Sequence, residues 1–296
     1  MMDFNRKQTI FISDHNPVIY RTLYLQTVLN PCHSVFLSTV TENNKTKIIM
    51  SELRLAVLID ADNVPYANVR EMLEEVSKIG TPTIKRIYAD WTKPNASGWK
   101  NVLLEHAITP IQQYSYTSGK NSSDSALIID AMDILYSHKV DGFCIVSSDS
   151  DFTRLATRLR EAGMKVIGIG EKKTPQPFIT ACDKFIYIEI LKSEAKGAKT
   201  PKKKQEEKKD SHPLNKVDKE LIRMLRISVS DLADETGWTF LGELGSFILK
   251  KRPDFDPRNY GFEKLLPLIK STGEFEIDIR DTSSKFTKHI YIRNRN

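Results

Sequence analysis

The feature that most constrains this chain is an uninterrupted apolar run that ends abruptly in acids. Residues 55–59 are Leu, Ala, Val, Leu and Ile, and Asp60, Ala61, Asp62 and Asn63 follow them. A continuous apolar run of this length is typical of a strand buried on both faces, as in a parallel sheet covered by helices. In such sheets, functional groups gather just beyond the carboxyl ends of the strands. We therefore expect Asp60 to lie at that edge of a sheet.

A second stretch has the same form. Residues 143–146 are apolar, and they are followed by Ser147, Ser148, Asp149, Ser150 and Asp151. If the two strands are neighbours, several carboxylates converge on one small volume. Like charges that close together repel unless a cation lies between them. The two stretches therefore predict the two halves of one metal site.

Strand and helix patterns alternate from residue 53 to about 189. The expected strands are 53–60, 84–89, 111–116, 142–147, 165–169 and 185–188. The expected helices are 66–79, 99–107, 124–137 and 151–162, with a short element near 178–182. Strict alternation of this kind predicts an α/β fold in which helices flank a parallel sheet.

Composition divides the chain further. Residues 192–215 are rich in lysine and proline and nearly free of apolar residues, so we expect a flexible linker. Residues 192–209 hold eight lysines against three glutamates, a net +5 of the chain's +6, so the pI of about 9 says little about the folded parts. The expected domains are an uncertain N-terminal extension over 1–49, an α/β domain over 50–191, the linker, and a second domain over 216–296.

The extension over 1–49 has no clean hydrophobic period. Two interpretations stay open: a flexible or loosely docked segment, or a natural start at Met50.

Residues 216–296 have a clearer pattern. They show helical patterns at 217–225, 241–251 and 262–269, the last with Pro267 as a possible break, and then strands at 275–279 and 289–292 around a polar turn. Three helices followed by a hairpin predict a small winged helix-turn-helix domain.

The acids carry the chemistry that the sequence predicts. Asp60 and Asp149 end buried strands, Asp151 lies just beyond the second, and Asp124 opens the long helix. Carboxylate oxygens suit one or two Mg²⁺ or Mn²⁺ ions, which activate water for phosphodiester hydrolysis. The same Asp and Ser residues are also the preferred helix caps, so each one alone could simply start a helix.

Three further polar residues are expected to support these acids. Asn63 could orient a water or a phosphate, and Ser147 or Ser148 could hydrogen-bond a ligand carboxylate. Asp62 is expected to point elsewhere, because the chain turns after Asp60. Asp130 and Asp133 lie more than one helical turn beyond Asp124, so packing or helix-surface contacts are expected for both.

These stretches resemble the NYN domain, a branch of the PIN-like nuclease superfamily that includes the LabA-like proteins. The resemblance is carried by residues 58–63, 120–124, 126–132 and 146–152, together with Gly163–Val166 and Gly168. It implies a PIN-like fold and a metal-dependent ribonuclease with Asp60, Asp124, Asp149 and Asp151 in the acidic site.

The C-terminal residues resemble the OST-HTH, or LOTUS, domain, through residues 237–245, 253–262 and 264–266. That resemblance implies RNA binding or a protein partner. Most aromatic residues in these segments are expected to form the core of a small fold, although exposed ones could stack on unpaired bases. The expected RNA contacts are Lys120 in the first domain and the basic residues Lys250, Lys251, Arg252 and Arg258 in the second.

Together these observations predict a Mg²⁺- or Mn²⁺-dependent ribonuclease with a separate RNA- or partner-binding module. A non-catalytic RNA-binding regulator is the main alternative. The signature Asp60-Ala61-Asp62-Asn63-Val64 also fits a haloacid-dehalogenase-type phosphatase, in which Asp60 would be the nucleophile. Three scattered cysteines and the lack of a long apolar run favour a cytoplasmic protein without a membrane span. The oligomeric state stays open.

Overall fold

The computed structural model describes residues 19–23, 37–42, 45–50, 52–92, 98–114, 122–191, 213–281 and 288–295. It divides into two compact units, Met1–Glu52 and Leu53–Asn296. Lys120, residues 192–212 of the predicted linker and most of the predicted turn near 281–285 lie outside the described residues.

The first unit contains a three-stranded antiparallel sheet that the sequence patterns do not predict. Its strands are β1 (Ile19–Leu23), β2 (Leu37–Glu42) and β3 (Lys45–Met50), in that order across the sheet. β2 and β3 mix polar and apolar residues, so neither contains the long apolar run that marks the strands of the second unit.

The second unit begins with a six-stranded sheet in which every neighbouring pair is parallel. Its strands are β4 (Arg54–Asp60), β5 (Thr81–Ala89), β6 (Thr109–Gln112), β7 (Gly142–Val146), β8 (Lys165–Gly170) and β9 (Lys184–Tyr187). The order across the sheet is β6-β5-β4-β7-β8-β9. The two strands that end in acids, β4 and β7, are therefore neighbours at its centre, and this confirms the predicted α/β architecture.

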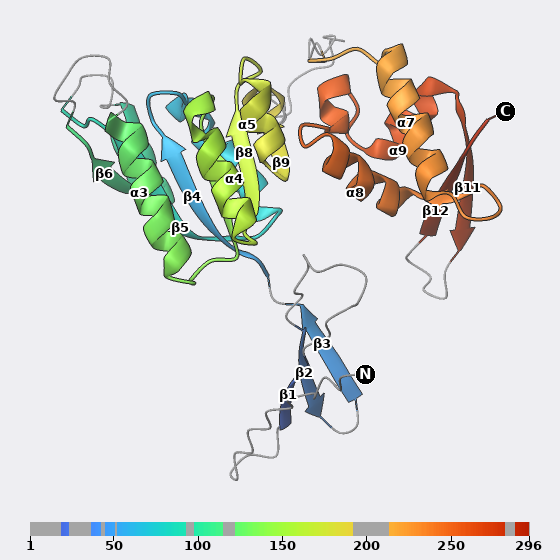
Figure 1. Ribbon diagram of the computed structural model, residues 1–296, viewed down its shortest axis with the longest axis horizontal. Helices are drawn as coiled ribbons and strands as arrows, with labels where there is room; N and C mark the ends of the chain where they lie inside the picture. The colour runs from blue at the N-terminus through green and yellow to red at the C-terminus, as the bar shows by residue number, and fades with distance from the viewer. Residues whose placement is uncertain are drawn as a thin grey trace, which may run out of the picture. The chain divides into compact units, whose positions relative to one another are not determined.

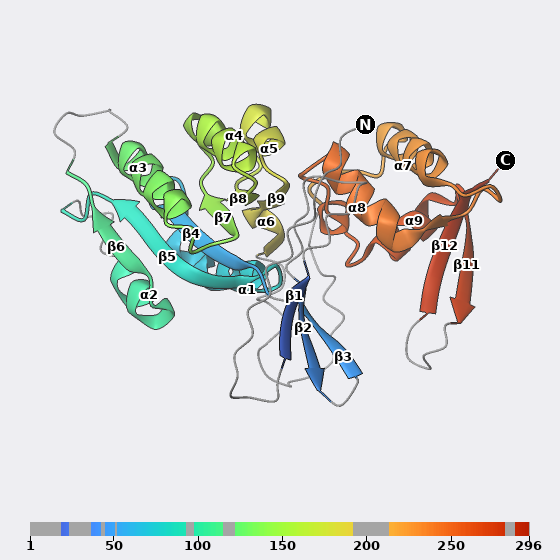
Figure 2. The same cartoon turned by 60° about the horizontal axis from the view of Figure 1, so that its bottom comes forward.

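Helices cover both faces of this sheet (Figures 1 and 2). One face packs against α3 (Ser122–Tyr136), α4 (Thr153–Glu161) and α5 (Gln176–Ala181). The other packs against α1 (Val69–Ser77), α2 (Trp99–His106) and α6 (Ile188–Leu191). Short 3-10 turns, η1 (Tyr66–Asn68) and η3 (Ser150–Phe152), lead into α1 and α4. Alternate residues of each central strand face opposite layers, so β4 and β7 are buried on both sides and must be apolar throughout.

Pro82 is the second residue of β5 and lies beside β4. A proline has no N–H for the ladder, so within a sheet it is confined to strand starts, edges and bulges. The register agrees, since Leu55 pairs with Pro82 and Ala56 pairs with Ile84, which leaves Thr83 as the extra residue. The strand therefore begins three residues earlier than the apolar pattern predicts.

The C-terminal part of this unit is a small helical domain with a three-stranded antiparallel sheet. Its elements are α7 (Lys219–Leu232), β10 (Thr239–Phe240), α8 (Leu241–Lys251), η5 (Pro257–Tyr260), α9 (Leu265–Thr272), β11 (Phe275–Asp281) and β12 (Lys288–Asn294). The strand order is β10-β12-β11. Pro267 does not break α9, because it lies in the first turn, where no N–H is needed.

Direct hydrogen bonds join this small domain to β9, an edge strand of the large sheet. The Phe185 N–H donates to the Pro253 carbonyl over 2.8 Å, and the Tyr187 hydroxyl donates to Asp254 over 3.0 Å. The Arg258 guanidinium donates to both carboxylate oxygens of Glu75 on α1, over 3.1 and 2.7 Å. The first of these contacts uses the Phe185 N–H, an edge group of β9 that would otherwise be available for pairing with another strand. Among the described residues, no helix has the length and apolar character that a membrane crossing needs.

Candidate active site

Asp60 is the most buried acid at the carboxyl edge of the sheet, with 1% of its surface exposed. The Asp62 N–H donates to its Oδ1 over 3.1 Å, while the Asn63 amide and the Ser147 hydroxyl donate to its Oδ2 over 2.6 and 2.8 Å. Burial raises the pKa of Asp60, and these hydrogen bonds oppose that rise. The Asn63 amide group is therefore directed at Asp60.

Ser147 connects the two central strands at the point where they end. Its hydroxyl donates to Asp60 and accepts a hydrogen bond from the Asp149 N–H over 3.1 Å, and the residue is fully buried. Ser148 has a different partner, because its hydroxyl accepts from the Glu171 N–H over 2.9 Å. Of the two serines, the structure thus brings only Ser147 to a carboxylate of this group.

Asp149 caps the turn that follows β7. Its Oδ1 accepts a hydrogen bond from the Asp151 N–H over 2.9 Å, as the capping interpretation predicts. Asp149 and Asp151 have four carboxylate oxygens between them, and the cap uses one of these, Oδ1 of Asp149. Asp151 is exposed at the start of η3. Capping and ligation are therefore compatible at this position.

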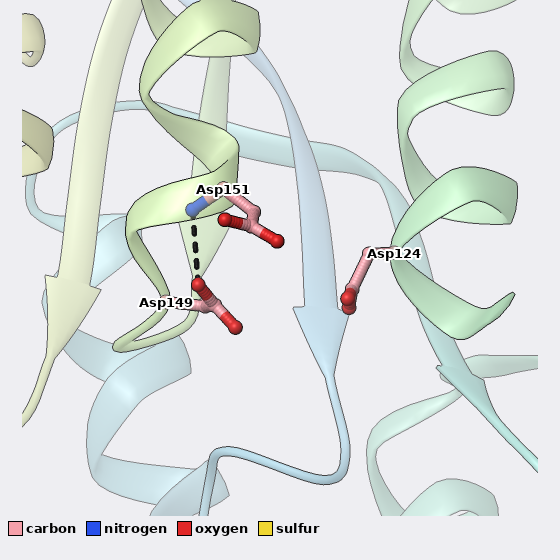
Figure 3. A group of neighbouring side chains, drawn as sticks. All are labelled: Asp124, Asp149 and Asp151. Atoms are coloured by element: carbon pink, nitrogen blue, oxygen red, sulfur yellow. Dashed lines mark hydrogen bonds between the residues drawn. The ribbon is translucent and has the colours of Figure 1, made fainter. Parts of the chain in front are cut away.

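Asp124 lies in the first turn of α3 and points across the carboxyl end of β4 toward Asp149 and Asp151 (Figure 3). One carboxylate oxygen from each of the three residues lies within 4.8 Å of the other two. The pKa of Asp124 is raised to about 6, first by burial and then by the charges of Asp60, Asp149, Asp151 and Asp62. Asp60 lies outside the group of three but close enough to act on it electrostatically.

The donor set fits a hard divalent cation. Every ligand that the group offers is a carboxylate oxygen, which suits Mg²⁺ or Mn²⁺ and does not favour zinc, with its preference for nitrogen and sulfur. Burial is the main cause of the raised pKa of Asp124, and the charges of the neighbouring acids add to it. A bound cation relieves such repulsion. The position agrees as well. Strands β4 to β6 are added toward one edge of the sheet and β7 to β9 toward the other, and ligands of open α/β sheets bind at this switch in strand order.

Neighbouring acids have other partners. Asp62 is exposed, and its Oδ2 accepts a hydrogen bond from Ser123 over 3.3 Å, a contact between the β4 loop and α3 that the sequence did not predict. Asp130 binds Arg86 and the Tyr88 hydroxyl on β5, in agreement with the predicted packing role. The two acids thus help to hold α3 at the edge of the sheet.

The predicted RNA contacts of the C-terminal domain differ in their surroundings. Lys250 is exposed and makes no ion pair within the described part of the chain. Lys251 pairs with Asp231 over 2.7 Å and lies 4.2 Å from the Phe247 ring centre, and Arg252 is 3.7 Å from Asp254. The Arg258 side chain is only 19% exposed, between Asp256 and Glu75. Its guanidinium is therefore engaged by two carboxylates, one of them on α1.

A helix-covered parallel sheet with acids at its central switch point, next to a small winged domain, defines a PIN-like α/β protein with an accessory module. Comparison with family models makes this specific: the NYN domain matches residues 54–189, and the OST-HTH/LOTUS domain matches residues 212–287. The chain therefore joins an NYN domain to an OST-HTH/LOTUS domain.

Other comparisons add little. No curated protein matches the sequence. A crystal structure of a protein of unknown function from Vibrio parahaemolyticus is 22% identical, covers 46% of this chain and 93% of its own, and has a TM-score of 0.40. A solution structure of an uncharacterized protein from Nitrosomonas europaea is 27% identical, covers 34% of this chain and 90% of its own, and has a TM-score of 0.23. At these TM-scores neither structure supports a conclusion about function.

Proposed function

We propose that this protein is a Mg²⁺- or Mn²⁺-dependent ribonuclease that hydrolyses RNA phosphodiester bonds. One observation carries the proposal: Asp124, at the start of α3, and Asp149 and Asp151, in the turn after β7, each place a carboxylate oxygen within 4.8 Å of the other two at the switch point of an NYN domain. Capping accounts for Asp149 alone and does not account for this convergence. The LOTUS domain supports RNA as the substrate, because that family suggests RNA or protein binding.

Asp124, Asp149 and Asp151 would hold the ion. Asp60 would lie next to them, buried at the end of β4. When bound, the ion supplies a more acidic water and neutralises charge on the scissile phosphate. The chain's own residues set the geometry. Ser147 and Asn63 hold the Asp60 carboxylate, and the Asp149–Asp151 hydrogen bond keeps the start of η3 facing Asp124. The buried free thiols of Cys144 and Cys182 are in keeping with action in the reducing cytoplasm.

The geometry does not favour the phosphatase alternative. A nucleophilic Asp60 must reach the phosphorus of its substrate, whereas this side chain is 1% exposed and accepts three hydrogen bonds. Asp60 is better suited to holding the site together than to attacking a substrate.

The test is cleavage of single-stranded and structured RNA with Mn²⁺, Mg²⁺ or EDTA. Asp149→Asn removes the charge and keeps a good cap, and Asp133→Asn, on an exposed position of α3, is the matched control. We expect metal-dependent cleavage that falls at least 100-fold in Asp149→Asn and is unchanged in Asp133→Asn. Equal cleavage by Asp149→Asn would refute the site. RNA binding without cleavage by any variant would favour the non-catalytic regulator.

A further inference from the structure

The outer face of the small C-terminal sheet carries aromatic side chains that the core does not use. Phe240 on β10 pairs with Tyr291 on β12, and the next residue, Ile292, is fully buried. Since successive residues of a strand point to opposite faces, Tyr291 and its partner Phe240 point away from the core. His289, two residues earlier on β12, shares their face and is exposed.

These rings form one side of a hollow. The Phe240 ring centre is 5.3 Å from that of His289 and 5.7 Å from that of Tyr291. With Trp238, Asp234 and Glu243 they line a space of about 330 Å³. The only charged residues in this lining are the two acids. A hollow with aromatic walls and carboxylates suits a cation and disfavours a phosphate.

The same rings already bind guanidinium groups in this structure. The Arg280 guanidinium carbon lies 4.1 Å from the Tyr291 ring centre, and that of Arg293 lies 4.8 Å from the Trp238 ring centre. Each arginine is neutralised locally, Arg280 by Asp278 over 2.7 Å and Arg293 by Glu276 over 2.5 Å. Arg280 also acts electrostatically on Asp234. The negative charge still prevails, because the four acids Asp234, Glu243, Glu276 and Asp278 outnumber the two arginines.

Both acids are suited to hold a cation. Asp234 accepts hydrogen bonds from the N–H groups of Thr236 and Trp238, each over 2.9 Å, so its position is fixed. The Thr236 hydroxyl and these N–H groups lower the pKa of Asp234, which keeps it charged. Glu243 is exposed in the first turn of α8 and has no ion-pair partner within the described ranges.

We propose that this hollow binds an arginine side chain of a protein partner, stacked on the aromatic rings and paired with Glu243 and Asp234. Arginine fits better than lysine, because a planar guanidinium stacks on ring faces and binds carboxylates through two N–H groups. RNA fits poorly, since its phosphates would meet two carboxylates. The proposal does not depend on nuclease activity. It places partner binding at the start of α8, whereas Lys250 and Lys251 lie in the last turn of that helix.

The test is titration of the full-length protein with a short Gly/Ser peptide that contains one arginine. The control peptide carries citrulline, which has nearly the same shape without the charge. We expect saturable binding of the arginine peptide that weakens with salt, and at least tenfold weaker binding of the citrulline peptide. No saturable binding, or equal binding of the two peptides, would overturn the proposal.

Variants locate the binding. Glu243→Gln changes an exposed side chain and should weaken arginine-peptide binding about fivefold, and Trp238→Leu should abolish it. Glu235→Gln, an exposed acid outside the hollow, should leave binding unchanged. Binding that neither Glu243→Gln nor Trp238→Leu changes would overturn the assignment. Single-stranded RNA could instead compete with the arginine peptide for the wild-type protein. If Glu243→Gln and Trp238→Leu also lose that RNA binding, the hollow is assigned to RNA.

Discussion

At the scale of single residues, the acidic edge depends on how each carboxylate is held. Asp60 is buried and accepts three hydrogen bonds, whereas Asp151 is exposed. Ser147 stands between the two strand ends, because one hydroxyl donates to Asp60 and accepts from the Asp149 backbone. A single small side chain thus sets the separation of two acids.

Ser147→Ala should therefore destabilise the protein. The change removes a donor to a buried carboxylate and leaves the Asp149 N–H without this partner, which costs roughly 1–3 kcal/mol of the free energy of unfolding. Chemical denaturation measures the loss, with the exposed Ser150→Ala as control. An Ser147→Ala protein as stable as Ser150→Ala would show that these hydrogen bonds contribute nothing net.

Asp124→Asn should stabilise the metal-free protein at pH 7. The pKa of Asp124 is about 6 in the fold, against 3.8 for the ordinary group, so its charge disfavours folding above pH 6, and this penalty disappears as the pH falls toward 4. We expect a gain on the order of 1–2 kcal/mol at pH 7 in EDTA and none at pH 4.

The sign of this effect should reverse with a bound ion. In saturating Mn²⁺ the wild type gains ligand-linked stability that Asp124→Asn largely loses. Thermal unfolding with EDTA and with Mn²⁺ measures both effects. The same shift in melting temperature under the two conditions would contradict Asp124 as a ligand.

At the scale of elements, α3 packs over β4 and β5 and has to hold Asp124 at the carboxyl end of β4. Its apolar residues pack on the sheet, but apolar packing alone allows a helix to slide. Asp130, which binds both Arg86 and Tyr88 on β5, supplies a directional contact. Burial and the charge of Asp130 raise the pKa of Tyr88 well above its usual range, so its hydroxyl remains a donor.

Asp130→Asn should weaken the attachment of α3. Arg86 loses its charged partner in a partly buried place, which we expect to cost about 1–3 kcal/mol of stability, and Mn²⁺ affinity should fall several-fold because Asp124 is held less firmly. Denaturation and Mn²⁺ titration measure the two effects, with Asp133→Asn as control. Unchanged Mn²⁺ affinity despite lost stability would limit Asp130 to packing.

At the scale of the whole molecule, Arg258 joins the LOTUS domain to α1. Burial alone would raise the pKa of Glu75, but hydrogen bonds from Arg258 and Lys78 outweigh it and lower the pKa to about 2. A lowered pKa means that the pair's contribution is complete above pH 4.5 and is lost as the pH falls toward 2.

Glu75→Gln should therefore uncouple the two domains at neutral pH. We expect a loss of about 2–3 kcal/mol, less than for a completely broken buried pair because Asp256 still binds Arg258. Thermal unfolding should separate into two transitions, and the difference from wild type should vanish near pH 2. Glu74→Gln, an exposed acid paired with Arg70, is the control. A single unchanged transition in Glu75→Gln would show that this ion pair does not couple the domains.

The sequence by itself determined the order of strands and helices, the parallel character of the sheet and the acids at the strand ends. These follow from local properties: a strand buried on both faces must be apolar throughout, and the residues just beyond it are free to be polar. The same reasoning missed β10, which is only two residues long, and the antiparallel sheet of the first unit, whose strands have no long apolar run.

The tertiary structure alone decided which groups meet. Contacts between residues far apart in the chain decide three features of the molecule. β4 and β7 are neighbours, Ser147 rather than Ser148 reaches Asp60, and Arg258 binds Glu75 on α1. A basic residue looks the same in sequence whether it faces solvent or a carboxylate. Its partner is set by packing, because the free energy of burying a charge depends on what lies opposite it in the folded protein.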